Sequence, residues 1–370
     1  MIKRNSCISC GSDLEDQYTI EKFPIFMGTT TQEIKEDISA DMIFSKCKNC
    51  NLIQLRDLIP LEVLYKNSHN QPIGKTWVDH HKKFADFVLQ YSRPSIIEIG
   101  GAHLMLAKHL ERDPKIESIT VYDTNVKEVN CKDSKILTNK AFFDSSSITS
   151  KPDMIIHSHV IEHLYDPISE IGKMADLLGE GGLMLISAPV IDTMMADGFT
   201  NAMNFEHSYG LTKNFLYKIL NKAGFSVLEE RDFSEHCIFI AAEKTRKTQT
   251  SFKKLEDCSY FYNFISHYEK EIDKIVPLLG KKEETFIFGA HIFTQFLLKF
   301  GLKEGSFLSV LDNDRKKQGK RLYGTGMIVE SPHILKNIKN PVVLLKAGQY
   351  TDEIKNDIIE NINSETRFIL

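Results

Sequence analysis

Apolar and polar positions change period most clearly near residue 100. A short apolar run over 95–99 ends at Gly100 and Gly101, and apolar residues then recur at helical spacing through residue 110. This pattern predicts a buried parallel strand, a tight turn and an amphipathic helix. Because a doubly wound α/β sheet begins in this way, we expect a ligand at the turn, beyond the carboxyl end of the strand. Glycine has no Cβ, so the backbone can approach that ligand closely.

The alternation of short apolar runs and helical patterns continues to about residue 243. Helices are expected at 77–91, 104–110, 168–178 and 214–223. Further strands are expected at 118–123, 153–159, 183–187, 225–230 and 236–242.

A polar segment over 243–251 predicts a linker, followed by a long helix over 252–279. The strand–turn–helix pattern then restarts at 284–300, with later strands at 306–312 and 341–346 and a helix from Thr351. We therefore expect an α/β protein with four segments. These are an N-terminal zinc-binding module over 1–75, a Rossmann-like sheet over 76–243, a linker and helix over 244–280, and a second, smaller α/β domain over 281–370.

The residues of the first glycine turn restrict its ligand. A dinucleotide pocket requires G-x-G-x-x-G to hold a pyrophosphate, and here the turn lacks the later glycines. An acid, Glu98, lies two residues before Gly100, at the end of the strand. A ligand with an adenosine group, a positive charge and no phosphate fits these residues, and S-adenosylmethionine is such a ligand. We expect Glu98, Gly100 and Gly101 to bind it.

Two further carboxylates are candidates for the same ligand. Asp123 ends the second strand, 23 residues after Gly100, where an acid is placed to accept the ribose hydroxyls. The alternative is a solvated aspartate in a loop. Asp144 follows Phe142 and Phe143, and this group could place an apolar wall and a carboxylate beside the adenine ring.

Four of the seven cysteines form two Cys-x-x-Cys pairs, Cys7 with Cys10 and Cys47 with Cys50. Four thiolates at this spacing suit a tetrahedral zinc ion with no open position, which predicts a role in folding. The alternatives are four buried free thiols or a redox pair. An odd number of cysteines without a disulfide framework favours a reducing, cytoplasmic location.

Composition excludes several other classes of protein. The 370 residues carry a formal net charge of −4 with 26% charged residues, so we expect no nucleic-acid partner. Apolar runs are shorter than the roughly 18 residues of a membrane span, and residues 1–5 lack the apolar core of a signal peptide. We therefore expect no membrane partner.

The chain resembles the class I S-adenosylmethionine-dependent methyltransferases. More narrowly, it resembles the three-part family that includes the nucleotide-sugar C-methyltransferases. The resemblance is carried by the cysteine pairs with 60–65, by 98–100 with Asp123 and 159–163, and by 310–313 with 317–319 and 324–325. Those C-methyltransferases carry paired tyrosines after the zinc module, of which this chain has Tyr65. The resemblance implies a methyl donor, S-adenosylmethionine, a structural zinc and a small-molecule acceptor, for which we expect a nucleotide-sugar that is methylated at carbon or oxygen.

In that family a Glu-His pair after the fifth strand supports base chemistry, and here the pair is Glu206-His207. An imidazole titrates near neutral pH and suits removal of a proton from the acceptor. We expect His207 to be the base and Glu206 to orient it. The alternative is that His207 only hydrogen-bonds substrate or opens the helix over 212–223. Asn204 and Tyr209 flank the pair and are expected to contact the acceptor.

The remaining candidates are histidines and one aspartate. His157, His159 and His163 could bind a metal, line the pocket or simply pack; we expect His159 beside the cofactor and His163 beside the acceptor. In the second α/β unit, Gly289 lacks a phosphate fingerprint, so we expect His291 and Asp312 to face the acceptor rather than a second cofactor. A purely structural lid is the alternative.

Two other functions remain open from the sequence. One is an NAD-dependent oxidoreductase or lyase built on two α/β units, and the other is a non-catalytic, zinc-containing assembly protein. The oligomeric state is not predicted.

Overall fold

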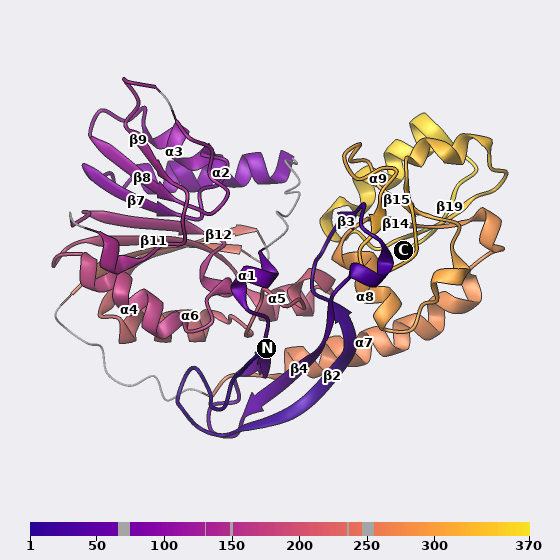
Figure 1. Ribbon diagram of the computed structural model, residues 1–370, viewed down its shortest axis with the longest axis horizontal. Helices are drawn as coiled ribbons and strands as arrows, with labels where there is room; N and C mark the ends of the chain where they lie inside the picture. Colours follow the sequence, from indigo (N-terminus) through magenta and orange to yellow (C-terminus); the bar gives the residue numbers. More distant parts are fainter. Residues whose placement is uncertain (66–74, 130, 149–150, 235–236, 246–254) are drawn as a thin grey trace.

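The computed structural model describes residues 1–65, 75–129, 131–148, 151–234, 237–245 and 255–370. The chain forms two α/β units joined by an N-terminal antiparallel sheet and a long helix (Figure 1). In the part of the chain that is described, no helix combines the length and apolar character needed to cross a bilayer.

The first α/β unit is built on a seven-stranded sheet in the order β12-β13-β11-β10-β7-β8-β9. All neighbours are parallel except those of β13, which runs antiparallel to both β11 and β12. The strand order reverses between β7 and β10, and this switch point is where such sheets bind ligands. The strands are β7 (Ser95–Ile99), β8 (Ser118–Tyr122), β9 (Ile136–Asn139), β10 (Met154–Ser158), β11 (Leu183–Pro189), β12 (Phe225–Ser234) and β13 (Cys237–Lys244).

Helices cover both faces of this sheet (Figure 1). On one face, α2 (Lys75–Leu89) buries Phe84 and Phe87 beside α3 (Met105–Leu110). On the other, α4 (Pro167–Leu177) and α6 (Lys213–Lys222) bury their apolar stripes. A fully buried phenylalanine contributes roughly 1.5–3 kcal/mol, so these stripes hold the helices in place. The Rossmann-like sheet expected from the sequence is confirmed.

Local sequence sets the ends of these helices. Asp166 accepts a hydrogen bond from the Ser169 amide (3.1 Å) and precedes Pro167 at the first helical position of α4. Thr212 accepts from the Phe215 amide (3.0 Å) at the start of α6, and Gly224, with φ +83°, follows its end.

The N-terminal segment forms a three-stranded antiparallel sheet of β2 (Leu14–Pro24), β4 (Ser39–Cys47) and β5 (Ile53–Leu55). β1 (Ile2–Lys3) pairs with β6 (Asp57–Leu58), and the short helix α1 (Leu61–Leu64) follows. β5 also bonds to the first α/β unit, because the Leu55 amide donates to Ser208 and the Gly210 amide donates to Ile53.

A second sheet of five parallel strands, in the order β17-β15-β14-β18-β19, forms the C-terminal unit. The helices α8 (Ile292–Lys299) and α9 (Thr351–Asp357) belong to it. The strands are β14 (Thr285–Phe288), β15 (Val310–Leu311), β17 (Val329–Glu330), β18 (Val342–Leu345) and β19 (Arg367–Ile369). The limits of the four segments remain predictions.

The N-terminal segment also contacts the C-terminal unit directly. β3 (Thr29–Thr30) pairs antiparallel with β16 (Arg321–Leu322). The Arg321 guanidinium donates to both carboxylate oxygens of Asp37 (2.5 and 2.9 Å), with both side chains nearly buried. A bidentate pair of this kind fixes orientation as well as position.

Two predicted elements differ from the structure. The helix α7 spans Ser259–Ile275 and not 252–279, because Pro277 lacks an amide proton and the chain tightens to a 3₁₀ turn at Val276–Leu278. Residues 246–254 lie outside the described residues, and so does most of the expected linker. Its first residues, Glu243 and Lys244, belong to β13, where Lys244 pairs with Phe225. The helix α5 (Ile191–Ala196) was not predicted.

Candidate functional site

The glycine turn after β7 is sterically closed to side chains. Gly100 has φ +83°, and a Cβ added there would lie 2.5 Å from Val160 Cγ2. A Cβ at Gly101 would lie 2.6 Å from Val121 Cγ1 and 2.7 Å from the Glu98 carboxylate. Both glycines are therefore required, and the turn lies directly against Val160, at the start of the turn that follows β10.

Glu98 is a buried acid beside this turn. Burial raises the pKa of Glu98 to about 8, and the neighbouring Asp123 acts in the same direction. Its Oε2 atom is buried and has no hydrogen-bond partner among the described residues. An unsatisfied buried acceptor is costly, so these residues fit a cationic ligand that donates to it.

We expect binding of S-adenosylmethionine to depend on the ionisation of Glu98. If the carboxylate is the form that binds a cation, raising the pH from 6 to 7 should lower Kd about tenfold, because both values lie below the pKa of this group. Calorimetry in buffers of different ionisation enthalpy should show release of about one proton at pH 7.

Glu98→Gln is the matched control, because it keeps the shape and removes the charge. The variant should lose both the pH dependence and the proton release. An unchanged slope in Glu98→Gln would contradict the role of Glu98.

Asp123 follows β8 and lies across the glycine turn. Its Oδ1 accepts a hydrogen bond from the Asn125 amide (2.6 Å), and its carboxylate also accepts a hydrogen bond from the Ala102 amide of the turn. Burial raises the pKa of Asp123, although these two amides and His103 oppose the shift. The structure thus brings Asp123 together with the glycine turn.

Asp144 has a different environment. Its exposed carboxylate accepts from the Ser146 amide (2.9 Å) and hydroxyl (2.8 Å) and caps a 3₁₀ turn, and these bonds lower its pKa. The neighbouring Phe143 packs edge-on against Tyr122, with ring centroids 5.4 Å apart. Phe143 and Tyr122 therefore form an apolar contact near Asp144, and the apolar wall stays a prediction. The adenine contact stays a prediction.

A cluster of ionisable side chains lies on the turn that follows β10. His159 Nδ1 lies 3.2 Å from Glu162 Oε1, and His163 Nε2 lies 3.8 Å from the same oxygen. Burial raises the pKa of Glu162, but His159, His163 and His207 outweigh it and lower that pKa to about 2. Glu162 is therefore an anion in a nearly closed site. His157 is buried within β10. Among the described residues, two groups of side chains that include histidines could hold a metal ion, and His157 belongs to neither.

His207 completes this cluster from the segment after β11. One ring nitrogen of His207, one of His163 and one Glu162 oxygen all lie within 4.8 Å of one another. His207 Nδ1 lies 3.1 Å from the Ala202 carbonyl, so the neutral ring carries its proton there and has a lone pair at Nε2. Burial, followed by His163, lowers the pKa of His207 to about 4.

Asn204 and Glu206 both position this segment. Asn204 Oδ1 accepts from the Glu206 and His207 amides (2.7 and 2.9 Å), and its Nδ2 donates to the Asn201 carbonyl (2.8 Å). The Glu206 carboxylate lies 3.7 Å from His163 Nδ1 and acts on His207 through charge. Asn204 thus holds the backbone turn, and Glu206 is placed beside both histidines.

Tyr209 is buried and stabilises the turn that carries Glu162 and His163. Its hydroxyl donates to the Ile161 carbonyl, within the turn that carries Glu162 and His163. Arg4 adds to this support, since its guanidinium donates to Ser208 (2.7 Å) and Tyr165 (2.7 Å) carbonyls. The hydroxyl of Tyr209 is engaged in this bond, and its expected contact with the acceptor stays a prediction.

Tyr65 and Glu162 lie at the site, although neither was among the residues predicted from the sequence to bind a ligand or to catalyse. Burial raises the pKa of Tyr65, and the negative charges of Glu206, Glu162 and Asp123 act in the same direction. The signal was present, because Tyr65 matches a tyrosine of the resembled family and Glu162 stands between the predicted residues of the 159–163 motif.

The C-terminal candidates lie in the second unit. The Asp312 carboxylate accepts from the Ala290 amide, the Asp314 amide and the Lys317 ammonium, each at 2.9 Å. His291 precedes α8. Asp312 therefore binds within its own unit, in the position that Asp123 holds in the first one, and a contact with the acceptor stays a prediction.

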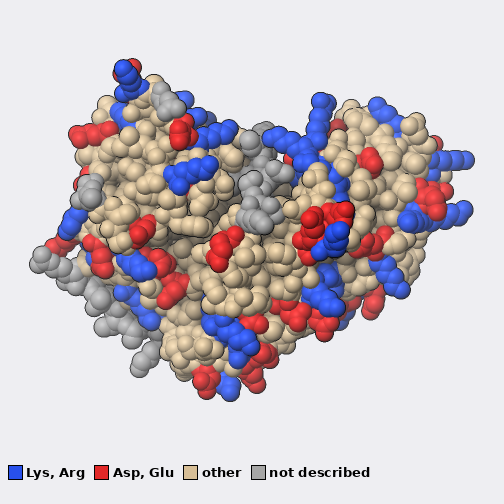
Figure 2. Space-filling model, viewed as in Figure 1, with Lys and Arg blue, Asp and Glu red and all other residues tan. Residues whose placement is uncertain are grey.

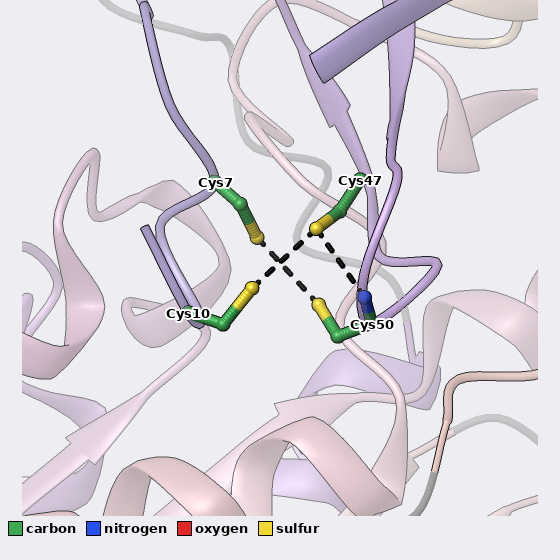
Figure 3. A group of neighbouring side chains, drawn as sticks. All are labelled: Cys7, Cys10, Cys47 and Cys50. Carbon is green, nitrogen blue, oxygen red and sulfur yellow. Dashed lines mark hydrogen bonds between the residues drawn. The ribbon is translucent and has the colours of Figure 1, made fainter. Parts of the chain in front are cut away.

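The four cysteine thiols of the N-terminal segment converge on one point (Figure 3). Cys7 Sγ lies 3.6 Å from Cys50 Sγ, and Cys10 Sγ lies 3.5 Å from Cys47 Sγ. A tetrahedral zinc with Zn–S bonds of about 2.3 Å separates its sulfurs by roughly 3.8 Å, close to these distances. The group contacts α6, where Lys218 and Lys222 donate to Ser9.

Comparison with known proteins gives a partial match. Residues 73–230 match the family model described as a methyltransferase domain. The magnesium protoporphyrin IX methyltransferase from Synechocystis PCC 6803 is 14% identical, over 46% of this chain and 84% of that one, with a TM-score of 0.37. The N-methyltransferase NodS from Bradyrhizobium japonicum WM9 is 15% identical, over 50% and 95%, with a TM-score of 0.37. No curated protein sequence matches the chain.

Proposed function

Because residues 73–230 form a class I S-adenosylmethionine-dependent methyltransferase domain, we propose that the chain methylates a nucleotide-linked sugar with His207 as the base. The observation that carries this proposal is the grouping of Glu162, His163 and His207 within 4.8 Å. Glu162 and His163 lie on the turn that starts at Val160, and His207 reaches them from the segment after β11. Val160 lies against the glycine turn, so the cluster adjoins the expected cofactor site.

The donor supplies a methyl group on a cationic sulfur. For the donor's ammonium and ribose hydroxyl groups the chain offers the unsatisfied Glu98 oxygen and, at the end of the neighbouring strand, the Asp123 carboxylate. Gly100 and Gly101 keep the turn free of side chains between them. These residues provide one carboxylate for a cation and one for hydroxyl groups. They lack the glycine pattern of a pyrophosphate-binding site.

The acceptor must lose a proton when it is methylated. A neutral His207 with its proton on Nδ1 can accept that proton at Nε2. The anionic Glu162 lies close enough to stabilise the imidazolium that forms, and Glu206 adds negative charge on the His163 side. His207 acts as the proton acceptor, and both glutamates act through charge.

A polar acceptor suits this site. Two histidines, two glutamates and the Tyr65 hydroxyl provide hydrogen-bonding groups at the carboxyl edge of the sheet. The resemblance to the three-part family narrows the acceptor to a nucleotide-linked sugar, methylated at carbon or oxygen. The second α/β unit, with His291 and Asp312, is the expected place for the rest of such an acceptor.

The N-terminal cysteines bind a structural zinc ion in this proposal. Their sulfur separations fit a tetrahedral ion, and four protein ligands leave no position open for substrate. The ion stabilises the two Cys-x-x-Cys turns, one of which contacts α6 through Ser9. It takes no part in the methyl transfer, which occurs at the edge of the sheet.

Loss of this zinc should destabilise the chain. We expect Cys47→Ser to lower Tm by at least about 5 °C, because the fully buried thiol would be replaced and the binding free energy of the metal would be lost. Differential scanning calorimetry measures the shift. Cys131→Ser, at an exposed free cysteine, is the control and should leave Tm unchanged. Equal Tm values for the two variants would contradict a structural zinc.

The acceptor can be identified directly. Purified protein is incubated with methyl-labelled S-adenosylmethionine and a panel of nucleotide-sugars, and products are detected by mass spectrometry. We expect a mass increase of one methyl group in at least one nucleotide-sugar, and at least about 10²-fold slower product formation with His207→Ala. Binding of S-adenosylmethionine without product from any nucleotide-sugar would overturn the acceptor class and leave the donor assignment standing.

A further inference from the structure

A second group of metal-ligating side chains lies at the same edge of the sheet. His80 comes from α2, His159 directly follows β10, and Cys237 is the first residue of β13. His80 and Cys237 are 2% and 3% exposed and have no part in the proposed methyl transfer. Their ligand atoms lie within 4.8 Å of one another.

The distances between the ligand atoms of this group are close to those between the ligands of a bound metal ion. Cys237 Sγ lies 3.8 Å from His80 Nε2 and 3.8 Å from His159 Nε2. A tetrahedral zinc with bonds of about 2.3 Å to sulfur and about 2.0–2.1 Å to nitrogen separates these ligands by roughly 3.6 Å. Two imidazoles and one thiol are also ligands that zinc and cobalt accept readily.

The surroundings of His159 match those of a metal-bound histidine. Its Nδ1 lies 3.2 Å from Glu162 Oε1, while its Nε2 faces Cys237. Metal-binding histidines commonly donate their second N–H to a carboxylate, which fixes the ring and its tautomer. His159 also has φ +52°, a conformation that costs energy in a non-glycine residue and is held where function requires it.

A fourth ligand is available next to the three. Ser187 Oγ, at the end of β11, lies 2.8 Å from His80 Nε2 and 3.5 Å from Cys237 Sγ. Ser187 is fully buried, and Trp77 packs against the His159 ring with centroids 4.9 Å apart. An oxygen ligand at this corner gives the group four neighbouring donors.

We propose that His80, His159 and Cys237 bind a divalent transition-metal ion of the zinc class, with the Ser187 hydroxyl at the fourth position. The ion ties α2, β10 and β13 together and holds His159 with its Nδ1–H donated to Glu162. The existence of this metal site is independent of the proposed function. The role of the metal in positioning Glu162 beside His163 and His207 rests on the proposed function.

Metal content of the full-length chain tests the site. After loading with Zn²⁺ and removal of excess ion, elemental analysis should give two equivalents in the wild type. We expect one equivalent in Cys237→Ser and one in Cys47→Ser, each losing a different ion. Cys131→Ser, at an exposed free cysteine, is the control and should keep two.

Cobalt identifies the ligands. With Co²⁺ in place of Zn²⁺, Cys47→Ser should retain a thiolate-to-cobalt absorption band that His80→Gln in the same background abolishes. If Cys237→Ser fails to fold, His80→Gln provides the same test from α2. Two equivalents in the folded Cys237→Ser or His80→Gln variant, or a single equivalent in the wild type that Cys47→Ser removes, overturns the proposal in favour of a metal-free thiol and imidazole group.

Discussion

We expect His207→Ala to lower kcat by about 10²- to 10⁴-fold, the usual contribution of a positioned general base. The variant removes the imidazole that has a ring nitrogen within 4.8 Å of Glu162 and His163. It leaves Glu98 and Asp123 intact, so binding of S-adenosylmethionine should be unchanged by calorimetry. Single-turnover measurements with the acceptor found by mass spectrometry report the loss.

His333→Ala is the control for this variant, because His333 is an exposed histidine of the C-terminal unit. It should retain wild-type kcat. A His207→Ala enzyme with more than about a third of wild-type kcat would show that another group removes the proton, and His163, between Glu162 and Glu206, would be the next to test.

The pH dependence of kcat/KM also tests the assignment of His207 as the base. A base acts in its neutral form, so the rate should fall when His207 becomes protonated. Because burial lowers the pKa of His207 to about 4, we expect kcat/KM to stay level from pH 8 down to about 5 with respect to this group. A fall centred near 6.5 that persists in Glu98→Gln would indicate a histidine with an ordinary pKa as the base.

Replacing Asp123 by alanine should weaken binding of S-adenosylmethionine about 10²-fold. Two hydrogen bonds from ribose hydroxyls to a carboxylate contribute roughly 1.5–3 kcal/mol each, and the lower end of their sum, roughly 3 kcal/mol, corresponds to about 10²-fold in Kd. Calorimetry on the full-length chain measures Kd. The effect should fall mainly on binding, because the described partners of the Asp123 carboxylate are the Asn125 amide and the Ala102 amide of the glycine turn, both at the expected cofactor site.

Asp176→Ala provides the comparison, since Asp176 is exposed on α4. Its Kd should equal that of the wild type. A change of less than about threefold in Asp123→Ala would separate the carboxylate from the cofactor and leave only the glycine turn and Glu98 as its site.

The core of the first α/β unit could be predicted because its sequence signals are local. The apolar run of β7, the glycine turn and the helical spacing of α3 all occur within 16 residues, and the structure confirms each. The N-terminal hairpin gave no such signal. Register shifts between Asp16 and Tyr18 and between Ile20 and Phe23 interrupt the alternation of β2, so its apolar positions do not repeat at every second residue.

The candidate site shows a similar limit. The adjacency of Glu206 and His207 in sequence predicted that one orients the other, yet the nearest described partner of the His207 ring is the Ala202 carbonyl, 3.1 Å from Nδ1. The turn held by Asn204 sets these directions, and a turn conformation is not visible in residue spacing. His80 and Cys237 are even further from prediction, because they lie 157 residues apart and meet only through the packing of α2 on β13.

The match to a methyltransferase domain also decides among the functions left open by the sequence. An NAD-dependent enzyme on two α/β units and a non-catalytic assembly protein are both disfavoured by it. Of the expected ligands, S-adenosylmethionine follows from the domain, whereas zinc and the nucleotide-sugar stay proposals. The cytoplasmic location stays a prediction.

The pairing of β3 with β16 and of β5 with residues 208–210 has a mechanical consequence. One N-terminal stretch is bonded to both α/β units, so rotation of one unit against the other must either deform that stretch or break backbone hydrogen bonds. We therefore expect access to the sheet edge to come mainly from small local displacements. The two units should also melt together in a single cooperative transition, since loss of either ladder releases the other.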